Sequence, residues 1–205
     1  MLIEVRGASV SFGSREVFAE VDMTFPDAEV SALIGPSGSG KSTMLGAVSG
    51  QLKLDRGHVR WGAASDAGSE PDPDLVAWVP QSASLLGHRS CVENVALAGL
   101  CRGLPRSAAM EMAHELLADF GLSKVALTPA GRASGGERQR ICVCRALATG
   151  RPLVIADEPS ANLDAANTDL VLAAFARLAG SGVTVIAASH DPAIVGVVSH
   201  VEYLR

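Results

Sequence analysis

A glycine-rich segment near residue 40 constrains this chain more than any other feature. Residues 35–42 read GPSGSGKS, which fits the pattern G-x-x-x-x-G-K-[ST] of a phosphate-binding loop. A strand pattern, Glu29–Ile34, precedes the segment and a helical pattern, Lys41–Ser49, follows it, which is the setting that the motif requires. The sequence therefore predicts a loop that binds nucleotide phosphates, although such a loop alone does not separate kinases, GTPases and transport ATPases.

The parts of this loop have separate predicted tasks. Its glycines allow backbone N–H groups to turn inward around phosphate oxygens, and the N-terminus of the following helix adds partial positive charge. We expect Lys41 to reach the β- and γ-phosphates and Ser42 to hold Mg²⁺. The alternative is a chance glycine-rich turn, which the strand and helix on either side argue against. The predicted nucleotide-binding residues here are Gly35, Pro36, Ser37, Gly38, Ser39, Gly40, Lys41, Ser42 and Thr43.

Two carboxylates follow another apolar strand pattern, at Asp157 and Glu158 in the segment LVIADE. Ligands of open α/β sheets bind at the carboxyl ends of the strands. We expect Asp157 to position Mg²⁺, directly or through water, and Glu158 to orient or deprotonate the attacking water. The alternative is a pair of solvated acids at a strand end. The phosphate-binding loop elsewhere in the chain favours the catalytic interpretation.

A second glycine turn lies at residues 133–140, which read ASGGERQR and open a long helical pattern. Ser134 and Glu137 have the spacing of a capping box, so a well-capped structural helix is one interpretation. Adjacent glycines at a helix start, here Gly135 and Gly136, also form an anion-binding turn. Because the chain already has one such loop, a second turn is most useful against a nucleotide held by another copy. This interpretation implies a dimer with ATP in its interface.

The strand and helix patterns predict an α/β fold. Short apolar runs alternate with helical segments, which indicates a mostly parallel sheet covered by helices. Residues 82–130 differ, because they contain two helical patterns, Val92–Cys101 and Arg106–Phe120, and no convincing strand. We therefore predict one domain over residues 1–205, with a nucleotide-binding core and an inserted helical subdomain at 82–130. The core comprises residues 1–81 and 131–205, and its strands are expected at 2–10, 22–25, 29–34, 75–79, 153–156 and 183–187.

The composition excludes several classes of protein. The formal net charge of −5 argues against a broad nucleic-acid surface. No segment has the ~18–20 apolar residues that span a bilayer, and the first residues do not resemble a secretory signal. The four cysteines lack the spacing of a metal site or a disulfide framework, so we expect small core residues of a reduced, cytoplasmic protein. Trp61 and Trp78 are also expected in the core.

The order of these motifs resembles the nucleotide-binding domain of ABC transporters over almost the whole chain. GPSGSGKST resembles its Walker A motif, LVIADE its Walker B motif and ASGGERQR its signature, where Ala133 replaces the usual leucine. Three further matches are Gln81 in WVPQ to the Q-loop, the segment SANLD at 160–164 to the D-loop, and His190 in ASHDP to the switch histidine. The resemblance implies a P-loop NTPase core with an N-terminal antiparallel β part and a helical insertion.

The resemblance also implies roles for single residues. Phe12 falls where the family places an aromatic residue against adenine, and core packing is the alternative for it. His190 is expected to contact the γ-phosphate, and Asp164 to communicate across the dimer. Gln81 is expected to link the metal site to the helical subdomain. The implied ligands are ATP and Mg²⁺. The implied catalytic residues are Glu158, His190, Lys41 and Gln81, the metal-binding residues are Ser42, Gln81 and Asp157, and the signature residues at the nucleotide are Ser134, Gly135 and Gly136.

The implied function is that of an ATP-hydrolysing homodimer beneath a separately encoded membrane permease, on the cytoplasmic face of the cell membrane and without a nucleic-acid partner. SGGERQR followed by ADEPSANLD resembles the branch that serves lipoprotein release, macrolide and peptide export and cell division, whose usual tract is ADEPTGNLD. Leu85–Leu97 falls where family members contact the coupling helix of their permease. The ATPase of a small-solute importer is the main alternative.

Two alternatives belong to other classes of protein. A soluble, non-transport ABC ATPase is less expected, because the chain holds one cassette and lacks the long insertion of the chromosome-maintenance relatives. A catalytically idle binding module is argued against by the presence of Glu158 and His190.

Overall fold

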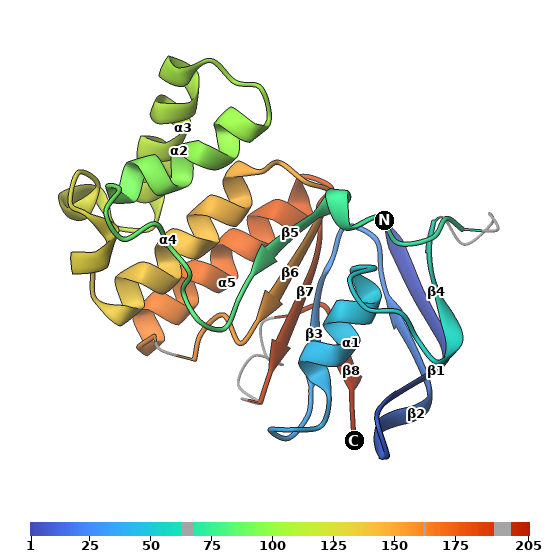
Figure 1. Cartoon of the computed structure of the whole chain (residues 1–205). Coiled ribbons are helices and arrows are strands. Elements are labelled where there is room, and N and C mark those ends of the chain that lie inside the picture. The colour runs from blue at the N-terminus through green and yellow to red at the C-terminus, as the bar shows by residue number, and fades with distance from the viewer. Residues whose placement is uncertain (63–67, 162, 191–197) are drawn as a thin grey trace. The chain divides into compact units, whose positions relative to one another are not determined.

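The computed structural model describes residues 1–62, 68–161, 163–190 and 198–205 (Figure 1). These residues fall into two compact units. The first unit comprises residues 1–76, 152–158 and 175–205, and the second comprises residues 77–151 and 159–174. Both units are therefore discontinuous in the sequence.

An antiparallel sheet of three strands lies in the first unit. Its order is β2-β1-β4, so β1 pairs with both neighbours. Alternation of buried and more exposed residues at the start of β1, as at Ile3 and Val5, buries one face of this sheet. The strands are β1 (Leu2–Phe12), β2 (Arg15–Phe25) and β4 (Arg56–Gly62).

A parallel sheet also lies in the first unit, with neighbouring strands in the order β6-β7-β3-β8. Every residue of β3, β6 and β7 is buried, as expected for parallel strands that are covered on both faces. Helix α1 (Lys41–Val48) contacts β6 and β7. These strands are β3 (Val30–Ile34), β6 (Leu153–Asp157), β7 (Thr184–Ser189) and β8 (His200–Tyr203).

Helices dominate the second unit. Three of them contact one another: α2 (Cys91–Cys101), α3 (Arg106–Asp119) and α4 (Gly135–Ala148). Both α2 and α4 begin with a capping box, which satisfies backbone N–H groups that have no partner inside the helix. The 3-10 helices η2 (Ser123–Val125) and η3 (Ala130–Arg132) connect α3 to α4.

Three further elements lie where the chain passes between the units. The 3-10 helix η1 (Pro73–Leu75) leads into β5 (Val76–Val79), and α5 (Ala165–Gly180) begins in the second unit and ends in the first. Among the described helices, none combines the length and the apolar character needed to cross a bilayer.

The predicted fold class is confirmed, because the structure combines a parallel sheet, an antiparallel sheet and covering helices. Two strands, β4 and β8, were not predicted from the sequence. The segment Ala63–Asp74 is rich in Gly, Ser, Asp and Pro, so the sequence predicts a surface loop there. Residues 63–67 of this segment lie outside the described part of the chain, and its end forms η1. Trp61 is buried as expected, whereas Trp78 is only half-buried.

The cysteines divide into two groups. Cys91, Cys142 and Cys144 are fully buried, and burial raises the pKa of each of these thiols. Cys101 is exposed, so the prediction that all four cysteines are core residues is wrong for this one. The reason is its place in the last turn of α2, on a side of the helix that the rest of the unit leaves open.

Candidate nucleotide-binding site

The loop between β3 and α1 depends on glycine at several positions. Gly38 and Gly40 have φ values of 81° and 95°, in the left-handed region that favours glycine. A Cβ atom on Gly40 would lie 2.6 Å from Val17 Cγ1, and one on Gly35 would lie 2.4 Å from the carbonyl oxygen of Leu204. These close approaches fix a curved backbone at the carboxyl end of β3. Its shape suits a loop that wraps around phosphate groups.

The side chain of Lys41 folds back along this loop. Its Nζ donates hydrogen bonds to the carbonyl oxygens of Gly35 (2.8 Å) and Pro36 (3.1 Å). Lys41 is only 7% exposed, so little water reaches its ammonium group. These carbonyl acceptors and Glu158, whose Oε1 lies 3.6 Å from Nζ, stabilise the charge instead. The loop thus holds a cationic group ready for an anionic ligand.

Ser42 and Asp157 form a pair of oxygen donors. Ser42 Oγ donates to Asp157 Oδ2 at 2.6 Å, joining the first turn of α1 to the end of β6. Asp157 is buried, while Ser42 is exposed. Hydroxyl and carboxylate oxygens are the ligands that Mg²⁺ prefers, and the metal usually keeps waters and takes substrate phosphates as well. The residues at this point therefore fit a magnesium ion bound beside the phosphate loop.

Glu158 has an unusual backbone conformation. Its φ of 49° lies in the left-handed region, which residues other than glycine rarely adopt, and such conformations cluster at functional sites. Its N–H donates to the carbonyl oxygen of Ala188 in β7 at 3.0 Å, which anchors it just after β6. The turn aims its carboxylate at His190, whose Nδ1 lies 2.9 Å from Oε2.

The Glu158 carboxylate lies between two groups that can carry positive charge. Lys41 Nζ faces Oε1, and the backbone N–H and the ring of His190 face Oε2. The side chain of Glu158 is 9% exposed and that of His190 is 60% exposed. A buried carboxylate with an orienting histidine at the open side can take a proton from a bound water.

The first unit thus brings together the predicted residues Lys41, Ser42, Asp157, Glu158 and His190, while Pro36, Ser37 and Gly38 lie exposed in the loop. Ser39 Oγ is buried without a hydrogen-bond partner among the described residues, and Thr43 is half-buried in α1.

Phe12 is the last residue of β1 and is 58% exposed. Its hairpin partner β2 reaches the loop, where Val17 and Phe18 lie against Gly40. An exposed aromatic ring can stack on a base.

The remaining predicted residues belong to the second unit. Gln81 is exposed after β5. Ser134 caps α4: its Oγ accepts from the N–H of Glu137, and Glu137 Oε2 accepts from the N–H of Ser134 at 2.7 Å. Gly135 and Gly136 form the first turn of this helix. Ala133 is buried, as a residue that replaces leucine should be.

Two predicted motifs extend beyond the described residues. In the segment 160–164, residue 162 is not described, while Asp164 is: its Oδ1 accepts from the N–H of Asn167 at 2.9 Å. The two residues after His190 are likewise outside the described part of the chain.

The structure also singles out residues that the sequence did not. Gln139 and Arg140, on α4, each bind a segment that is distant in the sequence. The sequence could have indicated these two residues as candidates, because they directly follow the predicted glycine turn. The acceptors that they reach cannot be predicted from one sequence.

Comparison with known proteins gives the family. The family described as ABC transporter matches residues 18–161. The lipoprotein-releasing system ATP-binding protein LolD of Paramagnetospirillum magneticum is 37% identical over 185 residues, which cover 86% of this chain and 81% of that protein. The Fe(3+) ions import ATP-binding protein FbpC of Streptomyces coelicolor is 36% identical over 191 residues, covering 93% of this chain but only 55% of that protein.

A solved structure agrees with these sequence relatives. MJ0796, described as a bacterial ABC transporter cassette in dimeric form, matches with a TM-score of 0.85 and 25% identity, covering 98% of this chain and 94% of that one. The fold and the site define a P-loop ATPase. The chain belongs to the ABC transporter family, as one of its ATP-binding, ATP-hydrolysing cassettes. The predicted family and ATPase activity are thereby confirmed.

Proposed function

We propose that two copies of this chain close around ATP and hydrolyse it to drive a membrane permease encoded as a separate chain. One observation carries the proposal: the contacts that join Lys41 to Glu158 and Glu158 to His190, beside the pair of Ser42 and Asp157. This arrangement supplies a cation for phosphates, oxygen ligands for a metal and a base for water. The dimeric form of the MJ0796 cassette supports the homodimer.

The phosphate loop and Lys41 hold the substrate in this mechanism. Backbone N–H groups of the loop bind the phosphate oxygens, and Lys41 Nζ exchanges its carbonyl acceptors for the β- and γ-phosphates. Ser42 and Asp157 would hold Mg²⁺, which when bound supplies positive charge beside the phosphates. Phe12 stacks on the adenine ring, where its exposed side chain supports this role.

Glu158 and His190 act on the water that attacks the γ-phosphate. The carboxylate of Glu158 accepts a hydrogen bond from this water and takes its proton as the new phosphorus–oxygen bond forms, while the bond from the γ-phosphorus to the bridging oxygen breaks and ADP leaves. His190 donates to the same carboxylate, which keeps it in one orientation. The exposed side of the histidine ring is available to the γ-phosphate. The low exposure of Glu158 limits competition from bulk water.

The glycine turn at the start of α4 completes the site from the other copy. Ser134, Gly135 and Gly136 present backbone N–H groups and a helix N-terminus, which bind anions. ATP that contacts both copies binds the closed dimer better than the open one, and this difference in affinity drives closure. Gln81 and Asp164 carry the change to the helical part of the chain and to the partner copy.

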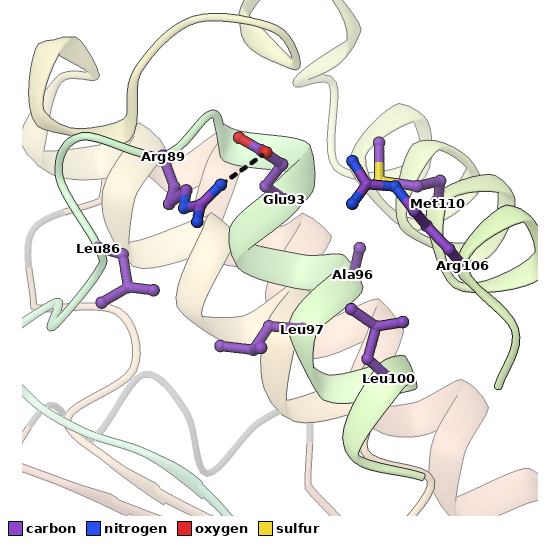
Figure 2. Close-up of a pocket in the computed structure, with 8 residues that line it drawn as sticks. All are labelled: Leu86, Arg89, Glu93, Ala96, Leu97, Leu100, Arg106 and Met110. Atoms are coloured by element: carbon purple, nitrogen blue, oxygen red, sulfur yellow. Dashed lines mark hydrogen bonds and ion pairs between the residues drawn. The ribbon is translucent and has the colours of Figure 1, made fainter. Parts of the chain in front are cut away.

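A groove in the second unit is the proposed docking site of the permease. Its volume is about 200 Å³, and Figure 2 shows Leu97 and Leu100 along α2 with Met110 and Arg106 on α3. Arg89 is paired with Glu93 at 3.3 Å, whereas Arg106 has no ion pair among the described residues. An amphipathic helix with an apolar face and one acidic residue fits such a groove. The groove is lined by Leu86, Arg89, Glu93, Ala96, Leu97, Leu100, Arg106 and Met110.

The proposed class of transporter is the export or mechanical type. The similarity to LolD proteins over most of the length of both chains supports it. An importer ATPase is the second candidate, and the similarity to FbpC over 93% of this chain favours that alternative. In both cases the chain works at the cytoplasmic face of the membrane, bound to its permease and without a nucleic-acid partner.

Purification of the tagged chain from gently solubilised native membranes tests the proposal. A permease with few spans and a large extracytoplasmic domain is the expected partner. A permease with many spans, together with a solute-binding protein, would indicate the importer. ATPase activity without any membrane partner would contradict both transport functions.

A matched pair of variants tests the groove itself. Leu97→Asp should lose the partner, because it places a charge on the apolar wall of the groove. Leu127→Asp should retain the partner, because Leu127 is 76% exposed in the same unit and lies outside the groove.

A further inference from the structure

Two successive residues of α4, Gln139 and Arg140, bind segments that lie far apart in the sequence. Gln139 Nε2 donates to the carbonyl oxygen of Pro80 at 3.2 Å, and Pro80 directly precedes Gln81. Arg140 Nη1 donates to Oδ1 of Asn167 and, at 3.3 Å, to the carbonyl oxygen of Phe120. All these residues belong to the second unit. One helix thus holds two segments that carry proposed site residues.

The contact of Arg140 continues to Asp164. The backbone N–H and the Nδ2 of Asn167 both donate to Asp164 Oδ1, at 2.9 and 2.8 Å. The carbonyl oxygen of Asp164 accepts from the N–H of Thr168 at 2.9 Å, so Asp164 caps α5. Asn167 therefore joins the guanidinium of Arg140 to the carboxylate of Asp164 in an unbroken series of hydrogen bonds.

Packing alone does not account for these side chains. Gln139 is 1% exposed, yet its Oε1 has no hydrogen-bond partner among the described residues, and the same holds for the buried Nε of Arg140. A buried polar atom without a partner is unfavourable, so each of these side chains carries a cost that close packing alone does not require. Departures of this kind from the rules of packing are expected where function requires them.

The helix itself is a rigid connection. Gln139 and Arg140 lie within the first two turns of α4, which begins at Gly135 directly after Ser134. A displacement of the glycine turn moves the helix as one body, and the side chains at 139 and 140 move with it. Through their hydrogen bonds, this motion would displace the backbone before Gln81 and, through Asn167, the side chain of Asp164.

We propose that Gln139 and Arg140 are positioning residues that couple the glycine turn of α4 to Gln81 and, through Asn167, to Asp164. The inference rests on the proposed function, because it assigns the glycine turn to the ATP of the partner copy. The inference assigns neither residue a contact with ATP. Each instead sets where another residue lies when the dimer closes, so that binding at one nucleotide affects the other.

A double-mutant cycle on Arg140 and Asn167 tests the coupling with the full chain. Arg140→Ala and Asn167→Ala should each lower kcat by about tenfold, since a small misplacement near a reacting group slows a reaction by up to two orders of magnitude. The double variant should be no slower than either single one, because both remove the same connection. The Hill coefficient for ATP should fall toward one, and KM should change by less than about twofold.

Two further variants separate positioning from folding. Arg140→Lys keeps the charge and can still donate to Asn167, so it should regain part of kcat and of the cooperativity. Gln139→Met removes the donor to Pro80 with little change in shape and buries no charge, and it should lower kcat without weakening the binding of a fluorescent ATP analogue. Lys124→Ala is the control, because Lys124 is an exposed cation of the same unit that lies outside the glycine turn and its helix. It should behave as the wild type does.

Several results would overturn the inference. Variants that lose thermal stability but keep the wild-type kcat and Hill coefficient would show that Arg140 and Asn167 are only structural. Additive losses in the double variant would show that the two residues act separately. If the wild-type chain showed no ATP turnover, or formed no dimer when ATP is added, the proposed function would be overturned, and this inference with it.

Discussion

The two compact units hold their site residues in different ways. In the first unit the side chains contact one another directly, from Ser42 to Asp157 and from Lys41 through Glu158 to His190. In the second unit, within the described residues, no hydrogen bond joins Gln81, Ser134 and Asp164. Neighbours on α4 and α5 hold the segments that carry Gln81 and Asp164.

This difference distinguishes residues that act on ATP and water from residues that respond to the nucleotide and to the partner copy. Direct contacts fix charges to within a fraction of an ångström, which bond formation requires. Contacts through neighbouring helices allow a site residue to move when the helix moves, which suits a part of the chain that responds to nucleotide and partner. Substitutions in the first unit should therefore affect ATP binding and the chemical step directly, whereas those in the second should act on turnover through cooperation between copies.

The largest effect is expected at Glu158. Glu158→Gln should lower ATP turnover by about 10³-fold, in the middle of the range for loss of a general base. The variant should still bind ATP and should accumulate as an ATP-dependent dimer. Phosphate release and size-exclusion chromatography with light scattering measure the two outcomes. Full activity would remove Glu158 from its proposed role, and Glu16→Gln, at an exposed position of β2, is the control that should remain active.

A smaller effect is expected at Lys41. Lys41→Ala should weaken ATP affinity by about 10- to 100-fold, which corresponds to the loss of a charge-assisted hydrogen bond. Titration with a fluorescent ATP analogue measures it. Lys124→Ala, at an exposed position of the second unit, should leave the affinity unchanged. Equal affinities for the two variants would contradict the assignment of the phosphate loop.

Gly40 tests whether the first unit depends on the shape of its loop. Gly40→Ala forces a side chain into the left-handed region and against Val17, so it should lower the free energy of unfolding by about 1–3 kcal/mol. Urea denaturation measures this change. Gly180→Ala is the control, because a Cβ atom there meets no neighbour within 4 Å. An unchanged stability of the Gly40 variant would show that the loop adapts.

The smallest effect compares two capping boxes. Ser134→Ala and Ser90→Ala each remove an N-cap from a helix of the second unit, so each should cost about 1 kcal/mol of stability. Only Ser134→Ala should also weaken the ATP-dependent dimer, because only this cap lies in the proposed nucleotide contact. Thermal unfolding and light scattering with ATP give the two quantities. An equal loss of dimer in both variants would show that the glycine turn of α4 is only the capped start of a helix and does not contact the nucleotide.

Local patterns predicted the parts of the fold that are long or strongly apolar. Strands β3, β6 and β7 were predicted because burial on both faces leaves apolar runs in the sequence. Strand β4 was missed because its sequence, RGHVRWG, is mostly exposed and polar at its start. Strand β8 was missed because it has only four residues, none of them fully buried.

The candidate site could be predicted only in part, because a local sequence pattern identifies only the residues whose chemistry lies within one motif. Residues 35–43 and Glu158 carry their chemistry in a local motif. The partner of Gln139 lies 59 residues away in the sequence, and which carbonyl it reaches is decided by tertiary packing.

The burial of three cysteines gives the chain a built-in reporter position. Cys91, Cys142 and Cys144 are shielded and hold their protons, so a maleimide dye will react first with the exposed thiol of Cys101. Cys101 is the last residue of α2 and directly follows Leu100, which lines the proposed docking groove. A fluorophore or spin label attached there, without any engineered residue, would report the arrival of a membrane partner in real time.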